Sequence, residues 1–215
     1  MTVETDRDAT SASTGRGPTT RAERQAQTRE RLVEVARELF LADGYNATSL
    51  DKVAVAAGFS KGAVYSNFSG KEELCMAVLD TIHEEQIAGV VEAFTSDTDL
   101  DGRIDAFAGW AREKLGHPRW TALEVEFAAV ARQSPWVATE LVKRHRALVE
   151  AAAGLIERVM ADAGLALEIE PRKAATALLS LGIGLGAMRS LDGQLDVEVF
   201  ADTMRALLRG NARQP

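Results

Sequence analysis

The chain has 215 residues, of which 46% are hydrophobic and 27% are charged, with a formal net charge of −7. This composition is typical of a folded globular protein, and the single cysteine, Cys75, excludes an intrachain disulfide. No uninterrupted apolar run approaches the roughly 18 residues that span a bilayer, and the first 27 residues lack the apolar stretch of a signal peptide. We therefore expect a cytoplasmic protein with no membrane partner.

The charge is distributed unevenly along the chain. Residues 16–71 contain nine Lys or Arg and six Asp or Glu, whereas residues 72–215 contain 15 basic and 23 acidic residues. A basic N-terminal third on an acidic body permits nucleic-acid binding at one end but does not require it, because such an excess also occurs on ordinary surfaces.

The first segment, residues 1–20, is rich in Ser, Thr, Gly and Asp, which predicts a disordered tail. Five arginines follow at positions 16, 21, 24, 29 and 31. They could form an arm along DNA phosphates or in a minor groove. The simpler interpretation is a solvated tail that leads into a helix.

From residue 28 the apolar spacing predicts three consecutive helices. The first carries one buried stripe, made of Leu32, Val35, Ala36, Leu39 and Phe40, and stops at Gly44. Thr48 and Asp51 form a capping-box pattern that starts a second helix, which ends at Gly58. Ser60 is the expected cap of a third short helix, whose Val64 and Phe68 face inward.

Further helices are expected from Lys71 to about residue 94, and over residues 100–116, 119–132, 136–163, 171–191 and 196–209. The breaks coincide with Gly or Pro residues, and no segment has the alternation of a strand. The predicted fold is all-α, with a three-helix DNA-binding domain at residues 21–75 and a helical bundle at residues 76–215.

Two short helices joined by Gly58-Phe59-Ser60 form a helix-turn-helix pattern. Small residues at the start of the second helix, Gly62 and Ala63, allow the backbone to approach a groove. The Tyr65 hydroxyl and the Lys71 ammonium suit phosphate oxygens. The side chains of Lys61 and Asn67 can form hydrogen bonds with base edges or with phosphates.

The stretch from Thr28 to Leu79 closely resembles the DNA-binding domain of the TetR family of transcriptional regulators. The resemblance rests on Phe40, Gly44-Tyr45, Thr48, Ala54, Ala57-Gly58, Ser60, Gly62, Tyr65, Phe68, Lys71, Glu72 and Leu74. Asn67 stands where the family usually has His, which leaves the contact made at this position open.

The resemblance implies a homodimer that binds double-stranded operator DNA. It further implies phosphate contacts from Thr48, Tyr65 and Lys71, base-facing roles for Lys61, Gly62, Ala63, Ser66 and Asn67, and either role for Ser49. Regulators of this kind carry a C-terminal domain for dimerisation and for a small-molecule effector. Repression relieved by the effector is the expected mode, because occluding a promoter needs only binding.

The segment Ala174–Arg189 is almost continuously apolar, and a helix that is hydrophobic all round is expected to be buried on all sides. Gly182, Gly184 and Gly186 within it favour close helix packing rather than a nucleotide-binding loop, because no strand precedes them. With the final helix, this segment is expected to build a two-fold, four-helix dimer interface. The final helix would contribute Val197, Val199, Phe200, Met204, Leu207 and Leu208.

Aromatic and apolar residues of the middle helices are candidates for lining an effector pocket: Phe107, Trp110, Trp120, Leu123, Phe127, Trp136, Met160 and Met188. The alternative is that they are ordinary core residues. Glu124 and Glu126, on the same predicted helix, could meet a polar ligand if buried, or could pair with arginines.

Other function classes find little support in the sequence. There is no nucleophile elbow, and His83, His117 and His145 lack the paired spacing of metal ligands, so no enzyme activity, cofactor or metal is expected. Cys75 is expected to be buried rather than redox-active. A helical adaptor that no longer binds DNA remains the alternative to a regulator.

Overall fold

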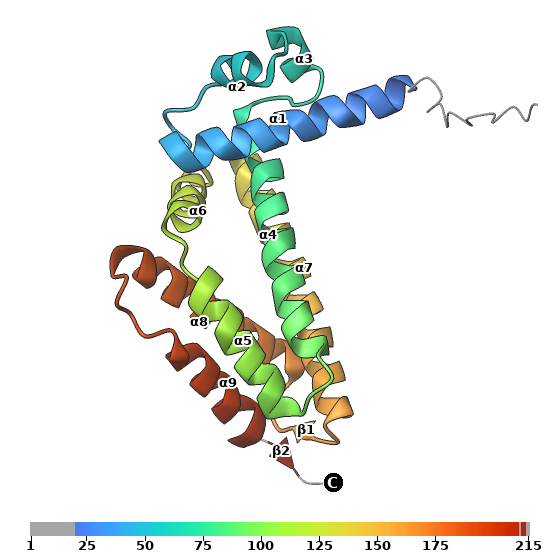
Figure 1. Cartoon of the computed structure of the whole chain (residues 1–215), viewed down its shortest axis with the longest axis vertical. Helices are drawn as coiled ribbons and strands as arrows, with labels where there is room; N and C mark the ends of the chain where they lie inside the picture. Colours follow the sequence, from blue (N-terminus) through green and yellow to red (C-terminus); the bar gives the residue numbers. More distant parts are fainter. Residues whose placement is uncertain (1–19, 211, 214–215) are drawn as a thin grey trace, which may run out of the picture.

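The computed structural model describes residues 20–210 and 212–213 (Figure 1). The predicted tail, apart from Thr20, lies outside the described residues. The described chain folds into nine helices: α1 (Arg21–Asp43), α2 (Leu50–Ala57), α3 (Lys61–Tyr65), α4 (Lys71–Thr95), α5 (Leu100–Lys114), α6 (Pro118–Val130), α7 (Pro135–Asp162), α8 (Pro171–Leu191) and α9 (Glu198–Gly210). The all-helical prediction is confirmed, with one addition. Two short strands, β1 (Ala166–Leu167) and β2 (Ala212–Arg213), pair in antiparallel fashion.

Helix α1 begins about two turns earlier than its apolar stripe predicts. The Thr20 side chain accepts a hydrogen bond from the Glu23 amide, and the Glu23 carboxylate accepts one from the Thr20 amide. This reciprocal capping box satisfies free amides at the helix start, so a polar segment becomes helical without an apolar face. The helix ends at Gly44, whose φ of 87° is unfavourable for other residues.

The predicted start of α2 is wrong by one residue. Ser49, not Thr48, is the N-cap, and its side chain accepts a hydrogen bond from the Lys52 amide. Thr48 is 1% exposed, and its hydroxyl donates to the Gly44 carbonyl at 2.9 Å. The two other signals at this site are confirmed: Gly58 ends α2 in the left-handed region, and Ser60 caps α3.

The two larger hydrophobic cores occupy the two ends of the molecule (Figure 1), and a third, small cluster of Val149, Ala153 and Ala175 joins α7 to α8. The upper core joins α1, α2, α3 and the first half of α4 to Leu123 and Phe127 of α6 and Val137 of α7. The lower core joins the end of α4 to α5, α7, α8 and α9. Helix α4 runs continuously through both cores, and upper-core packing continues to Ile82. A domain division at residue 75 therefore stays a prediction.

Helix α8 is less covered than expected. It buries Ala174, Ala175, Leu178, Gly182 and Gly186 against the rest of the chain. The opposite face, which includes Thr176, Ala177, Ser180, Ile183, Gly184 and Leu191, is exposed. We expected α8 to be buried on all sides, but within a single chain only one of its faces is buried.

Within the described residues, α8 is also the helix long and apolar enough to cross a bilayer by length and composition, and 22% of its apolar window is buried. The expectation that no segment would reach this threshold is wrong. Helices covered by other protein surfaces have the same composition.

The final helical segment turns most of its apolar residues into its own chain, whereas Val199 is 45% exposed and its place in an intersubunit surface stays a prediction. Val197, Phe200, Met204 and Leu208 are buried in the lower core, so their assignment to an intersubunit surface is wrong. Gly182 permits the close approach of α8 and α9, because a Cβ at this position would lie 3.1 Å from the Phe200 ring. Close packing at the α8 glycines is confirmed for Gly182 and Gly186, whereas Gly184 has open space beside it.

Candidate nucleic-acid interface

Helices α2 and α3 lie above α1, on the side of α1 that is turned away from the lower body (Figure 1). Val53, Val64 and Phe68 anchor it in the upper core. Lys61, Gly62, Tyr65 and Ser66 are exposed along α3 and at its C-terminal end. The predicted outward face of this helix is therefore available to a partner.

A shallow hollow of about 300 Å³ lies between the start of α2, helix α3 and the start of α4. It gathers Thr48, Ser49, Lys61, Tyr65 and Lys71, which are five of the predicted contact residues, from three separate segments. Its other lining residues are Asn46, Ala47, Leu50 and Asp51. The two ammonium groups and the hydroxyls of Ser49 and Tyr65 suit a phosphate oxygen, whereas the buried Thr48 hydroxyl is directed to the Gly44 carbonyl.

Lys71 is held toward the α1–α2 loop. Its ammonium lies 4.1 Å from the centre of the Tyr45 ring and donates to the Asn46 carbonyl at 3.4 Å. Burial lowers the pKa of Lys71 from its ordinary value. The ring and the carbonyl thereby fix the position of the ammonium in the hollow.

Lys61 is exposed and paired with Asp51 of α2 at 2.8 Å. The hydrogen bond to Asp51 raises the pKa of Lys61, so the side chain is cationic at neutral pH. Tyr65 is 51% exposed on the same face. A partner that binds Lys61 must compete with the Asp51 carboxylate.

The side chain of Asn67 is folded onto its own segment. Its amide nitrogen donates to the Ala63 carbonyl at 2.8 Å, and the Ser66 hydroxyl donates to the same carbonyl at 2.9 Å. These bonds complete the end of α3. A base contact by Asn67 or Ser66 requires the side chain to leave this position.

Two residues that were not predicted to position the helix-turn-helix, Arg29 and Glu73, hold the end of α3 and the loop after it. The Arg29 guanidinium donates to the Asn67 carbonyl at 3.0 Å and lies 4.1 Å from the centre of the Phe68 ring. Glu73 accepts hydrogen bonds from the amide and hydroxyl of Ser69, both at 2.8 Å. Arg29 thus supports the segment at the end of α3 and is not part of a free arm.

Helix α6 reaches the loop that leads into α2. The Glu126 carboxylate accepts hydrogen bonds from the Tyr45 amide at 2.9 Å and the Asn46 amide at 3.4 Å. A Cβ at Gly44 would lie 2.9 Å from this carboxylate. Two residues earlier on α6, Glu124 contacts His83 of α4 at 2.8 Å. Two carboxylates of α6 therefore connect this helix to α4 and to the loop that leads into α2.

The candidate effector-pocket residues do not line one cavity. Leu123 and Phe127 belong to the upper core, where the Phe127 and Tyr45 rings are 5.4 Å apart between centroids. Phe107 and Met160 belong to the lower core.

The remaining candidates are scattered in the same way. Trp110 packs on Phe107, Trp120 packs against the upper core, and Met188 and Trp136 are largely exposed. Of all the candidates, only Met160 lines the second hollow of about 200 Å³, together with Glu157, Ala161, Leu165, Leu167 and Pro171. The structure distributes these residues between the two cores and the surface, and their role in effector binding stays a prediction.

A family model described as "Bacterial regulatory proteins, tetR family" matches residues 32–78, the segment that builds the hollow. The HTH-type transcriptional regulator UidR of Escherichia coli K12 is 28% identical over 187 residues, which cover 85% of this chain and 92% of UidR. The chain belongs to the TetR family of transcriptional regulators.

Solved structures agree with this assignment for the TetR-family chain. Salmonella enterica GusR is 25% identical with a TM-score of 0.64, over 86% of this chain and 94% of that one. SmeT in complex with triclosan shares the fold, with 19% identity and a TM-score of 0.62 over 84% and 90% of the two chains. An N-terminal helix-turn-helix on a helical body is therefore the fold of this regulator.

Proposed function

We propose that this TetR-family regulator binds palindromic operator DNA as a homodimer and represses transcription until a small-molecule effector releases it. The observation that carries DNA binding is the hollow in which Ser49, Lys61, Tyr65 and Lys71 converge beside the exposed face of α3. In a dimer, two such faces would enter successive major grooves about 34–36 Å apart.

The dimer is supported by α8. Its face from Thr176 to Leu191 is free of charged side chains, and Ile183 and Leu191 are 62% and 82% exposed. An uncharged helix face of this length favours a second copy of the same helix across a two-fold axis.

Effector control is supported by the links from α6 to the DNA-binding elements through Glu124 and Glu126. SmeT, which shares the fold, forms a complex with triclosan. An effector acts here only if it prefers one position of the helix-turn-helix over the other. A ligand that binds this protein but leaves operator affinity unchanged would contradict this part of the proposal.

The first experiment is a mobility shift with the DNA immediately upstream of the protein's own coding region. We expect a saturable shift, weakened on the order of 10-fold in Lys71→Ala, with the slope of log K against log salt reduced by about one per lost phosphate contact. Lys143→Ala removes the same charge from an exposed position on α7 and serves as the control.

The outcome that would contradict DNA binding can also be stated. If the protein shifts neither this DNA nor any sequence selected from a random pool at low salt, the adaptor alternative is correct. If Lys71→Ala and Lys143→Ala weakened DNA binding equally, the hollow would not be part of the DNA interface.

A further inference from the structure

Helix α1 continues well beyond the elements that it supports. Its contact with the end of α3 is made by Arg29, whereas residues 21–27 are exposed on all sides (Figure 1). Eight residues separate Arg21 from Arg29, which corresponds to about 12 Å of helix, or the rise of three to four base pairs. This extension projects past the recognition helix without packing on it.

The extension carries its positive and negative charges on opposite sides. Arg21, Gln25, Arg29 and Leu32 follow one another at intervals of four, four and three residues, so they share one side of the helix. Since Arg29 on this side contacts α3, Arg21 faces the side of α1 on which α3 lies. Arg24 is about one turn along from Arg21 and is rotated by about 60° around the helix axis, away from Arg29.

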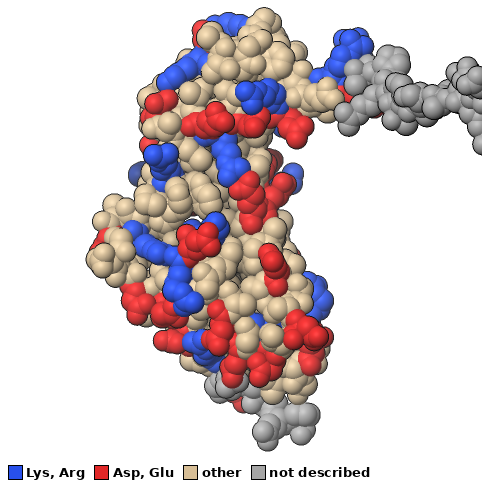
Figure 2. Space-filling view, viewed as in Figure 1, with Lys and Arg blue, Asp and Glu red and all other residues tan. Residues whose placement is uncertain are grey.

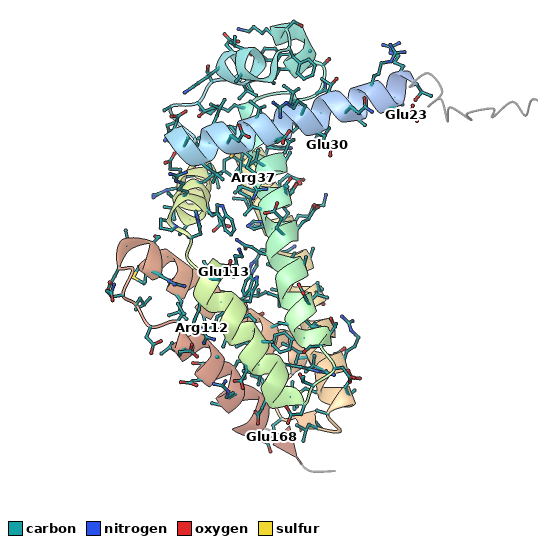
Figure 3. All side chains as sticks on the ribbon, viewed as in Figure 1. Glu23, Glu30, Arg37, Arg112, Glu113 and Glu168 are labelled. Atoms are coloured by element: carbon teal, nitrogen blue, oxygen red, sulfur yellow. The ribbon has the colours of Figure 1, made fainter. Side chains whose placement is uncertain are left out.

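The glutamates occupy the other side of α1. Glu23, Glu30 and Glu34 are spaced by seven and four residues, which places them together on a helix. Figure 3 shows Glu23 and Glu30 on the side turned away from α2 and α3, and Figure 2 shows Lys and Arg side chains on the opposite, upper side of this end of α1. A polyanion that contacts α3 would therefore meet the arginines and not the glutamates.

Neither Arg21 nor Arg24 is used within residues 20–210: their guanidinium groups make no hydrogen bond or ion pair there. The other two described arginines of the segment are engaged, Arg29 with Asn67 and Arg31 with Glu34 at 2.6 Å. The Thr20–Glu23 capping box meanwhile stabilises two solvent-exposed turns that would be marginal alone. Within the described residues, this capped helix end thus presents two cations without a side-chain partner.

We propose that the first two turns of α1 are a second DNA-binding surface, on which Arg21 and Arg24 bind phosphates flanking the major groove that α3 enters. This inference rests on the proposed DNA binding and extends its footprint outward. The contact is to the DNA phosphate backbone. Two guanidinium groups on an exposed helix face supply positive charge, but nothing holds them in the bidentate geometry that base recognition requires. It therefore raises affinity without setting sequence preference.

The test compares Arg21→Ala/Arg24→Ala with wild type on two duplexes. One carries the selected operator with flanks of about one helical turn, and the other ends at the outer edges of the half-sites. On the long duplex we expect about 10-fold weaker binding and a salt slope smaller by about two per protomer. On the short duplex the two proteins should bind alike.

Two further variants separate contact from structure. Arg21→Lys/Arg24→Lys retains both charges and should bind the long duplex within about threefold of wild type, since phosphate contacts depend mainly on charge. Arg132→Ala/Arg146→Ala removes two exposed arginines from the body and should leave both duplexes unaffected.

The inference is overturned if the double alanine variant and wild type show equal affinity and equal salt slopes on the long duplex. A wild-type protein that binds no duplex of either length would contradict the proposed DNA binding itself.

Discussion

In the free chain, the side chains that we propose as DNA contacts already have partners. Lys61 is paired with Asp51, Lys71 with Tyr45 and Asn46, and Asn67 with the Ala63 carbonyl. DNA phosphates and bases must replace these partners, which costs part of the new interaction. The exchange is least costly for Lys61, because both members of its pair are exposed.

The loop after α3 depends on an ionised Glu73. The hydrogen bond from the Ser69 amide, together with its hydroxyl, lowers the pKa of Glu73 below its ordinary value. A carboxyl group with a depressed folded pKa stabilises the fold above its unfolded pKa, and this contribution is lost as the pH falls through the folded pKa.

We therefore predict that Glu73→Gln lowers the free energy of unfolding by about 1 kcal/mol at pH 7. The difference from wild type should shrink as the pH falls below about 4. Urea unfolding of both proteins at several pH values measures it. A difference that stays constant down to pH 3 would mean that the charge of Glu73 contributes nothing.

Cys75 provides a residue-scale check of the upper core. The side chain is fully buried, and burial raises the pKa of its thiol. We predict negligible reaction with a disulfide reagent at pH 8 in the native protein and complete reaction in denaturant. Rapid stoichiometric labelling of the native chain would mean that α4 opens readily, and would revive a redox role for this cysteine.

At the scale of single elements, most helix ends follow from local signals. Gly44, Gly58 and Ser60 act within a few residues of their own positions, so the sequence predicts them. The choice between Thr48 and Ser49 as cap is not local, because it depends on whether the carbonyls of Leu39 and Gly44 are positioned to accept from Thr48.

The links that connect α6 to the DNA-binding elements are of this nonlocal kind. Glu126 and the Tyr45 amide are 81 residues apart in sequence, and no spacing rule brings them together. The sequence presents Glu126 only as a polar residue on a predicted helix. Its partners became known only from the packing of α6 against α1.

We predict that Glu126→Ala frees the amides of Tyr45 and Asn46 and loosens the position of α2 and α3. Operator affinity should fall severalfold and the free energy of unfolding by about 1–3 kcal/mol, because the part-buried Tyr45 amide loses its acceptor. Amide hydrogen exchange at Tyr45 and Asn46 should accelerate more than exchange in α8.

Glu157→Ala, an exposed change on α7, is the matched control for Glu126→Ala. Unchanged exchange at Tyr45 and Asn46 in Glu126→Ala would show that the loop is held by its other contacts, and that α6 does not position the helix-turn-helix through this carboxylate.

At the scale of the whole molecule, apolar pattern predicts burial but not which surface provides it. Most of the candidate pocket residues pack in the interior, but they are divided between two cores. The sequence could not predict this division, because the spacing of apolar residues within one helix does not specify which other helix they contact. The apolar residues of α9 likewise meet α5 and α8 of the same chain, and this leaves α8 as the main uncovered apolar surface for a second copy.

The final prediction concerns that surface. Ile183 is 62% exposed near the middle of the uncharged α8 face, and a glutamate there would place two like charges together across a two-fold axis. We predict that Ile183→Glu is folded but monomeric by analytical ultracentrifugation, and that its affinity for the complete palindrome falls on the order of 100-fold or more, because two half-sites are no longer bound by one particle. Affinity for a single half-site should be unchanged.

Val125→Glu adds the same charge at an equally exposed apolar position on α6, and should remain dimeric. If Ile183→Glu also sediments as a dimer and binds the palindrome like wild type, the subunits associate through a different face, and the exposed side of α8 must be covered by another partner.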